Sequence, residues 1–321
     1  MNAAATQDWA HRLKNFPARS ALRLANAPPV SRVLANRYRR ALAAHRAALP
    51  VLSGLDREIV TGLERDGIFV TSLDVLGLPG SQEALRAGQR LADAFAEEAR
   101  QQVAAGKTFT IVPPGNIANT PEIVMWGLHD RLLDIVEAYI GLPVAYDGVN
   151  IIYTVADGRE AGTRQWHRDW EDRKTIKVAI YCNDVGKQDG PFQAIARADP
   201  AQDDARGYHY TTATSAELAT VLGADFERDI VTCDGPAGTV IFVDTAKCFH
   251  RGQPAFATDR RAIFHSYFAR TPRHPFLCER SGMTRGQLSR LARGLNPRQQ
   301  STILWRRSLP ALVRLIPPAT L

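Results

Sequence analysis

The sequence lacks any apolar run of about 18 residues, the length required to cross a bilayer. Its amino terminus also lacks the short apolar core of a secretory signal. Cysteines are few (Cys182, Cys233, Cys248 and Cys278), and none belongs to a C-x-x-C pair of the kind found in zinc and redox sites. We therefore expect a cytoplasmic protein whose thiols stay reduced.

Acidic residues are almost absent from both ends of the chain. Residues 1–50 contain nine Lys and Arg against one acid, and residues 270–321 contain ten Arg against one acid. Residues 51–269 contain 21 bases and 31 acids, so two basic arms flank an acidic body. Basic segments favour anionic partners such as a membrane surface, a phosphorylated substrate or nucleic acid. The alternative is that both arms dock on the acidic body of the same chain.

The amino-terminal arm is predicted to form amphipathic helices. Pro17 is expected to end the first of them, because proline removes a backbone donor. A second helix, after residue 30, has Leu34, Tyr38 and Leu42 on one side and arginines around them. A basic helix with such a face can lie on an anionic bilayer, which predicts peripheral contact with the inner face of a membrane. Packing against the body of the protein is the other prediction.

The middle of the chain changes from helices to short strands near residue 144. Residues 51–143 are mainly helical by pattern, with one helix expected over 122–139. Six strands separated by turn signals follow, at 144–154, 175–181, 192–196, 229–232, 239–243 and 262–268. Short strands without alternating helices are typical of a jelly-roll. We therefore predict a single α+β domain, in which helices cover a double-stranded β-helix (jelly-roll) core at 144–269.

The tail, residues 270–321, is predicted to be helical again. Thr284 and Gln287 form a capping box at the start of one helix, and Asn296 followed by Pro297 starts another. Two short helices in an arginine-rich tail loosely suggest a helix-turn-helix. A nucleic-acid-binding protein is therefore the alternative from another functional class, although a docked helix pair has the same sequence pattern.

The segment around His167 carries the chemistry. His167 and Asp169 are one residue apart, and alternate side chains of a strand point to the same face, so an imidazole and a carboxylate can reach one point. His250 follows the apolar run 239–244 and would lie at the mouth of a barrel. Two histidines and a carboxylate bind Fe(II) and leave positions open for a 2-oxo acid and O₂. Spacing alone leaves a second interpretation, in which both histidines are hydrogen-bonding residues of the core.

Two adjacent arginines, Arg260 and Arg261, open the last predicted strand. A guanidinium fixed inside a barrel can bind the far carboxylate of a dicarboxylate cosubstrate through a bidentate pair. A shift of one residue in register exchanges which arginine points inward, so both are candidates.

Residues 150–268 resemble the phytanoyl-CoA dioxygenase family of iron(II)- and 2-oxoglutarate-dependent oxygenases. The motifs are a W-H-x-D segment at 166–169, a G-P turn at 190–191, a G-T-V-I-F-V-D segment at 238–244, a histidine at 250 and an arginine at 260. The resemblance implies a jelly-roll in which His167, Asp169 and His250 hold iron. It also implies that Arg260, or Arg261 in the other register, binds 2-oxoglutarate. Because the aspartate is present, hydroxylation is expected rather than halogenation.

The substrate is less specified than the cofactors. The family includes membrane-associated hydroxylases that act on the Kdo sugar of lipopolysaccharide. Together with the basic arms, this resemblance implies hydroxylation of an anionic substrate, with a lipid-linked sugar acid at a membrane face as one hypothesis. A soluble CoA thioester or a small natural product is the alternative substrate.

Overall fold

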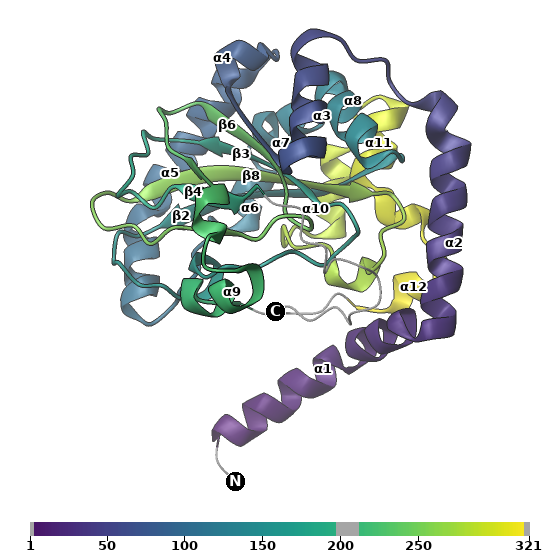
Figure 1. Ribbon diagram of the computed structural model, residues 1–321, viewed down its shortest axis with the longest axis horizontal. Coiled ribbons are helices and arrows are strands. Elements are labelled where there is room, and N and C mark those ends of the chain that lie inside the picture. Colours follow the sequence, from purple (N-terminus) through teal and green to yellow (C-terminus); the bar gives the residue numbers. More distant parts are fainter. Residues whose placement is uncertain (1–2, 197–211, 318–321) are drawn as a thin grey trace.

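Two antiparallel sheets lie at the centre of the computed structural model (Figure 1), which describes residues 3–196 and 212–317, with side chains from residue 15 onward. The larger sheet has the order β1-β6-β3-β8-β2, and the smaller sheet has the order β5-β4-β7. The strands of the larger sheet are β1 (Ile68–Ser72), β2 (Val144–Thr154), β3 (Ile176–Tyr181), β6 (Thr239–Asp244) and β8 (Arg260–Ala269). Those of the smaller sheet are β4 (Phe192–Ile195), β5 (Ile230–Cys233) and β7 (His250–Gly252).

The chain passes back and forth between the two sheets from β2 onward. After β2, Trp166 and His167 form bridges to Ala213 and His250, which adds an edge to the smaller sheet beside β7. The chain then enters β3 of the larger sheet, β4 and β5 of the smaller, β6 of the larger, β7 of the smaller and β8 of the larger. This connectivity is a double-stranded β-helix, so the predicted α+β jelly-roll is confirmed.

Alternate residues of each strand in the larger sheet serve two separate cores. In β6, Val240 and Phe242 belong to the core between the sheet and its helices. Ile241 and Val243 face the opposite way and pack with Phe192 of the smaller sheet. Continuous apolar strands such as β6 are therefore buried on both faces, because helices cover one face and the smaller sheet covers the other.

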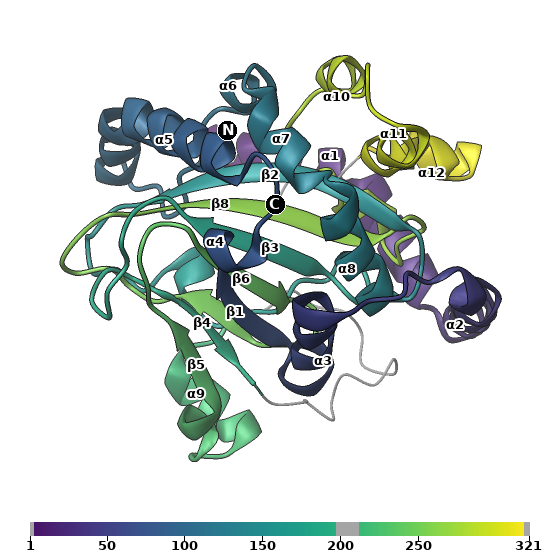
Figure 2. The same ribbon diagram turned by 90° about the horizontal axis from the view of Figure 1, so that it is seen from above.

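Helices cover the outer face of the larger sheet (Figure 2). They pack closely: a Cβ added to Gly88 would lie 2.5 Å from Cδ1 of Ile263 in β8. These helices are α3 (Gly54–Asp66), α4 (Leu73–Leu76), α5 (Ser81–Ala104), α6 (Pro114–Ala118), α7 (Pro121–Gly127) and α8 (Asp130–Ile140). A further helix, α9 (Ser215–Leu222), packs Leu218 against Trp166 beside the smaller sheet.

The helix predicted over 122–139 is wrong as a single element, because α7 and α8 are separate. Gly127 lies against His265 of β8, with no room for a Cβ. His129 then caps α8 by accepting the N–H of Arg131 at its Nδ1, at 3.3 Å. Close packing of the chain on the sheet at residue 127, followed by a side-chain cap, ends one helix and begins the next.

The amino-terminal arm consists of α1 (Ala3–Asn26), whose beginning extends away from the rest of the molecule, and α2 (Pro28–His45), which lies along its side (Figure 1). Further along α1, Ala18 is buried against Phe276 and Leu277. The expected break at Pro17 is wrong, because α1 continues through it. Pro17 is exposed, so water can replace the lost backbone hydrogen bond. Tyr38 and Leu42 of α2 pack against the helical core. Among the described residues, no helix is long and apolar enough to span a membrane.

The tail forms α10 (Arg285–Leu291), α11 (Pro297–Ile303) and α12 (Ala311–Leu315). Both predicted caps are confirmed, since Thr284 with Gln287 and Asn296 with Gln299 form capping boxes. Arg298 of α11 pairs with two acids of α8, Asp134 at 2.6 Å and Glu137 at 2.8 Å. This part of the basic tail is therefore docked on the acidic body.

Candidate metal centre

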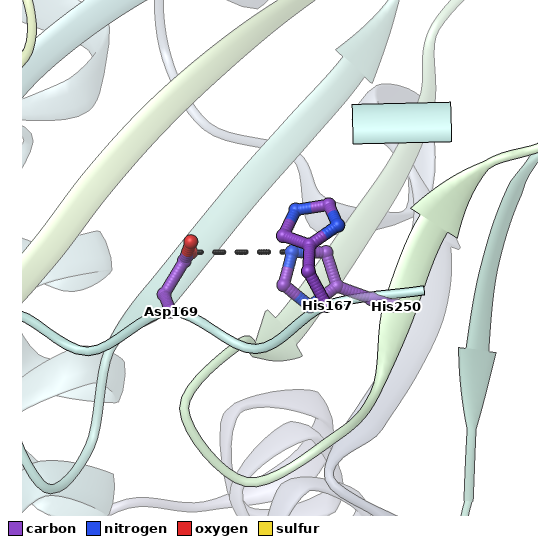
Figure 3. Close-up of side chains that lie close together, drawn as sticks. All are labelled: His167, Asp169 and His250. Carbon is purple, nitrogen blue, oxygen red and sulfur yellow. Dashed lines mark ion pairs between the residues drawn. The ribbon is translucent and has the colours of Figure 1, made fainter. Parts of the chain in front are cut away.

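The three residues predicted to hold iron lie together inside the jelly-roll. One ligand atom from each of His167, Asp169 and His250 lies within 4.8 Å of the others, and Nε2 of His250 is 4.0 Å from Oδ2 of Asp169. Figure 3 shows the two imidazoles beside each other, with the carboxylate facing them across a gap. The structure thus brings three residues that are up to 83 positions apart to one point.

The backbone brings the two histidines together in a way that differs from the sequence expectation. The apolar run before His250 is β6, which ends at Asp244, and His250 begins a separate strand, β7, of the smaller sheet. The N–H groups of His167 and His250 each donate to the carbonyl of the other, at 3.1 and 2.9 Å. The H-x-D segment is not a regular strand, because pairing ends at His167. The Asp169 N–H instead donates to the carbonyl of Thr245 at 2.9 Å.

Backbone carbonyls fix the tautomer of both imidazoles. Nδ1 of His167 is 2.9 Å from the carbonyl oxygen of Gln165, and Nδ1 of His250 is 3.2 Å from that of Cys248. A carbonyl oxygen can only accept a hydrogen bond, so each Nδ1 carries the proton and each Nε2 presents a lone pair. Histidines that bind metals are commonly oriented in this way.

Burial keeps the imidazoles in the neutral form that metals bind. Desolvation lowers the pKa of His167, and the nearby carboxylate of Asp169 opposes this only in part. Desolvation also lowers the pKa of His250 to well below its usual value, with the neighbouring His167 acting in the same direction. Both side chains therefore stay uncharged at neutral pH.

Asp169 is a buried carboxylate that remains ionised. Burial acts to raise its pKa, but the cations Lys177 and Arg280 outweigh burial and bring the pKa well below its usual value. Nζ of Lys177 lies 2.5 Å from Oδ2. This oxygen, which faces the histidines, accepts no hydrogen bond of regular geometry from the described part of the chain. An ionised, buried oxygen of this kind suits a metal ligand.

A cavity of about 580 Å³ contains the three side chains. Ile152, Phe192 and Phe264 give it apolar walls, and Arg260 projects into it from the start of β8. An apolar cavity with a few convergent polar groups is typical of a small-molecule site.

Arg260 is buried, and no carboxylate of the described residues pairs with it. Its guanidinium donates to the carbonyl of Gly190, in the predicted G-P turn, and to Oγ1 of Thr154 at 3.2 Å. Its Nε has no hydrogen-bond partner in the described structure. Desolvation accordingly lowers the pKa of this guanidinium. A buried cation without a counter-ion indicates a place for an anionic ligand.

Arg261 points to the other face of β8. It forms an ion pair with Asp93 of α5, and its backbone N–H donates to Asn183 at 2.8 Å. The observed register, in which Thr154 pairs with Arg260, therefore directs Arg260 rather than Arg261 into the cavity.

Sequence reasoning missed six charged residues that also line the cavity, namely Asp147, Arg164, Glu171, Lys177, Glu279 and Arg280. For Lys177 a signal existed, because one lysine interrupts the apolar strand Ile-Lys-Val-Ala-Ile-Tyr at 176–181. For Asp147, Gly148 inside a strand pattern was a signal for a bulge. Arg280 carried no local signal within the arginine-rich tail.

No family model matches the chain, and no curated protein matches its sequence. Among solved structures the chain is similar to EctD from S. alaskensis, with 20% identity and a TM-score of 0.45, over 69% of this chain and 80% of EctD. It is also similar to SnoN, the non-heme alpha ketoglutarate dependent epimerase from nogalamycin biosynthesis, with 16% identity and a TM-score of 0.42, over 71% of this chain and 87% of SnoN. HygX from Streptomyces hygroscopicus, crystallised with nickel and 2-oxoglutarate, has 13% identity and a TM-score of 0.42, over 68% of this chain and 88% of HygX.

Proposed function

We propose that the protein is an Fe(II)- and 2-oxoglutarate-dependent dioxygenase that hydroxylates a C–H bond. The observation that carries this proposal is the convergence of His167, Asp169 and His250 within a cavity that also contains the guanidinium of Arg260, which pairs with no carboxylate of the described residues. Two neutral imidazoles and one carboxylate are the donor set typical of non-haem iron oxygenases. The proposal agrees with the resemblance of residues 150–268 to the phytanoyl-CoA dioxygenase family.

Each residue has a defined role in this proposal. His167, Asp169 and His250 would hold the metal, and Arg260 would bind the far carboxylate of 2-oxoglutarate in a charge-assisted pair. When bound, iron(II) and 2-oxoglutarate supply the activation of O₂ that oxidises the substrate. The apolar walls around Phe192 and Phe264 keep water away from that chemistry.

Succinate formed from 2-oxoglutarate in air tests the proposal. The wild-type protein is expected to form succinate only when Fe(II) is added, and His250→Ala is expected to form none. His45→Gln is the matched control, because His45 pairs with Glu137 at 2.8 Å and does not line the cavity. Equal, iron-independent rates for the wild type and His250→Ala would contradict an oxygenase.

We further propose that the substrate is anionic and is reached at an anionic membrane surface, as for a lipid-linked sugar acid. Large apolar side chains are exposed beside arginines on both arms, including Phe16 and Leu24 of α1 and Leu312 and Leu315 of α12. Basic segments with exposed apolar residues favour an anionic lipid surface. A soluble CoA thioester or a small natural product is the alternative substrate.

Co-sedimentation with liposomes distinguishes these substrates. The protein is expected to pellet with anionic liposomes at low salt and to be released at high salt, because salt screens the attraction. Replacement of Leu312 and Leu315 by serine is expected to reduce pelleting. Failure of the wild type to pellet at low salt would remove the membrane proposal and leave a soluble substrate.

A further inference from the structure

The carboxy-terminal tail, residues 270–321, reaches the candidate metal centre through the side chain of Arg280. Its Nη1 lies 2.5 Å from Oε1 of Glu171 and 3.4 Å from Oδ1 of Asp169. Both carboxylates are buried, whereas the side chain of Arg280 is 27% exposed. Arg280 is therefore a cation that bridges two buried acids, one of which is a proposed metal ligand.

The backbone just before Arg280 has an unusual conformation. Glu279 has a φ of 69°, and it is the one non-glycine residue with a positive φ in the described ranges. Such a conformation is strained and persists only where the surroundings hold it. Here the carboxylate of Asp147 accepts the N–H of Glu279 at 2.6 Å and the N–H of Arg280 at 3.2 Å. Asp147 thus stabilises the turn that places the side chain of Arg280 beside Asp169 and Glu171.

A bulge in β2 presents Asp147 to this turn. The register between β2 and β8 shifts between Tyr146 and Gly148, and the intervening Asp147 lines the cavity. Gly148, at a φ of 103°, leaves the space that the tail occupies, since a Cβ there would lie 2.5 Å from Cβ of Ser281. The bulge therefore contacts the tail on both sides of Arg280, because Asp147 bonds Glu279 and Gly148 lies against Ser281.

The geometry around Asp169 assigns its two oxygens to different partners. Arg280 contacts Oδ1, whereas Oδ2 lies toward the histidines, 4.0 Å from Nε2 of His250. Lys177 contacts Oδ2 and so shares the oxygen that faces the metal position. Arg280 can consequently keep its contact when a metal binds, whereas Lys177 occupies the side that the metal needs.

We infer that Arg280 is a positioning residue for the metal ligand Asp169, delivered by the tail and held by Asp147. The inference rests on the proposed function, since it takes Asp169 to be a metal ligand. Loss of a partner that orients a metal ligand typically changes metal affinity or activity by about 10- to 100-fold. The tail, beyond the jelly-roll itself, is then a part of the metal centre.

Anaerobic titration of the apoprotein with Co(II), followed by visible absorption, tests this inference without turnover. Arg280→Gln is expected to raise the Kd for Co(II) by about 10- to 100-fold and to alter the cobalt spectrum. Asp147→Asn is expected to act in the same direction with Arg280 still present. The two N–H groups bond different oxygens of Asp147, and asparagine replaces one of these oxygens by a donor NH₂ group. Arg298→Gln, which removes an arginine of the same tail outside the cavity, is the matched control and is expected to bind like the wild type.

A double variant separates positioning from charge compensation. Removal of Arg280 alone leaves the buried carboxylate of Glu171 without this cation. The double variant, Arg280→Gln with Glu171→Gln, removes that carboxylate as well, so it leaves no such charge behind. The positioning role predicts that the double variant still binds Co(II) weakly, and wild-type affinity in it would overturn the inference. If Arg280→Gln fails to fold, as judged by circular dichroism, the double variant and Asp147→Asn carry the test.

Failure of the proposed function gives a different result. If His250→Ala binds Co(II) as well as the wild type does, the three side chains are not a metal site and the proposed function fails. If the wild type binds through these side chains but Arg280→Gln binds equally well with an unchanged spectrum, only the inference about Arg280 fails.

Discussion

Replacement of Arg260 by glutamine is expected to remove most of the affinity for 2-oxoglutarate. Arg260 is 5% exposed, and no carboxylate of the chain, as far as it is described, neutralises it. Truncating one partner of a buried, hydrogen-bonded charge pair costs about 2–5 kcal/mol. Since about 1.4 kcal/mol is a factor of ten, the Kd for 2-oxoglutarate should rise between about 30-fold and about 4,000-fold.

Arg261→Gln is the matched control for this prediction. It removes the neighbouring guanidinium, which pairs with Asp93 on the opposite face of β8. Isothermal titration with 2-oxoglutarate, under anaerobic conditions and with the metal present, measures both variants. We expect Arg260→Gln to lose most of its affinity for 2-oxoglutarate and Arg261→Gln to keep near wild-type affinity, with metal binding unchanged in both. A larger loss for Arg261→Gln would refute the assignment of the inward-facing arginine.

Two further predictions concern stability. Burial lowers the pKa of His265 to about 3, against about 6.5 in an unfolded chain. As the pH falls, the unfolded state therefore takes up a proton on this histidine before the folded state does. The contribution of His265 to stability is fully present above about pH 6.5 and is lost as the pH falls toward 3. Urea unfolding at several pH values should show a shallower acid loss for His265→Leu, and an equal loss would contradict this origin. Gly127→Ala would force a Cβ against His265 and Tyr146, so it should lower the free energy of unfolding by about 1–3 kcal/mol, measured as a lower Tm.

The candidate metal site and the strands could be predicted because both depend on patterns that are local in the sequence. Two patterns can be recognised without knowledge of tertiary contacts. One is the apolar run of β6 followed by His250, and the other is the pair His167 and Asp169. The capping boxes at Thr284 and Asn296 are equally local, and both are present in the structure.

Features that depend on tertiary contacts could not be predicted. The break between α7 and α8 follows from the packing of Gly127 on His265, which no local pattern encodes. Arg280 is one of ten arginines in the tail. It differs from the others by its ion pairs with Asp169 and Glu171 and by the strained turn before it, which Asp147, 132 residues from Glu279 in sequence, stabilises.

The most direct test of the central claim is an anaerobic titration of the protein with Fe(II) and 2-oxoglutarate, followed by visible absorption. A metal held by His167, Asp169 and His250 with 2-oxoglutarate chelated to it is expected to give a weak charge-transfer band in the wild type. His167→Ala with Asp169→Ala is expected to give none. An equally strong band in that variant, or no band in the wild type at saturating Fe(II) and 2-oxoglutarate, would contradict the account.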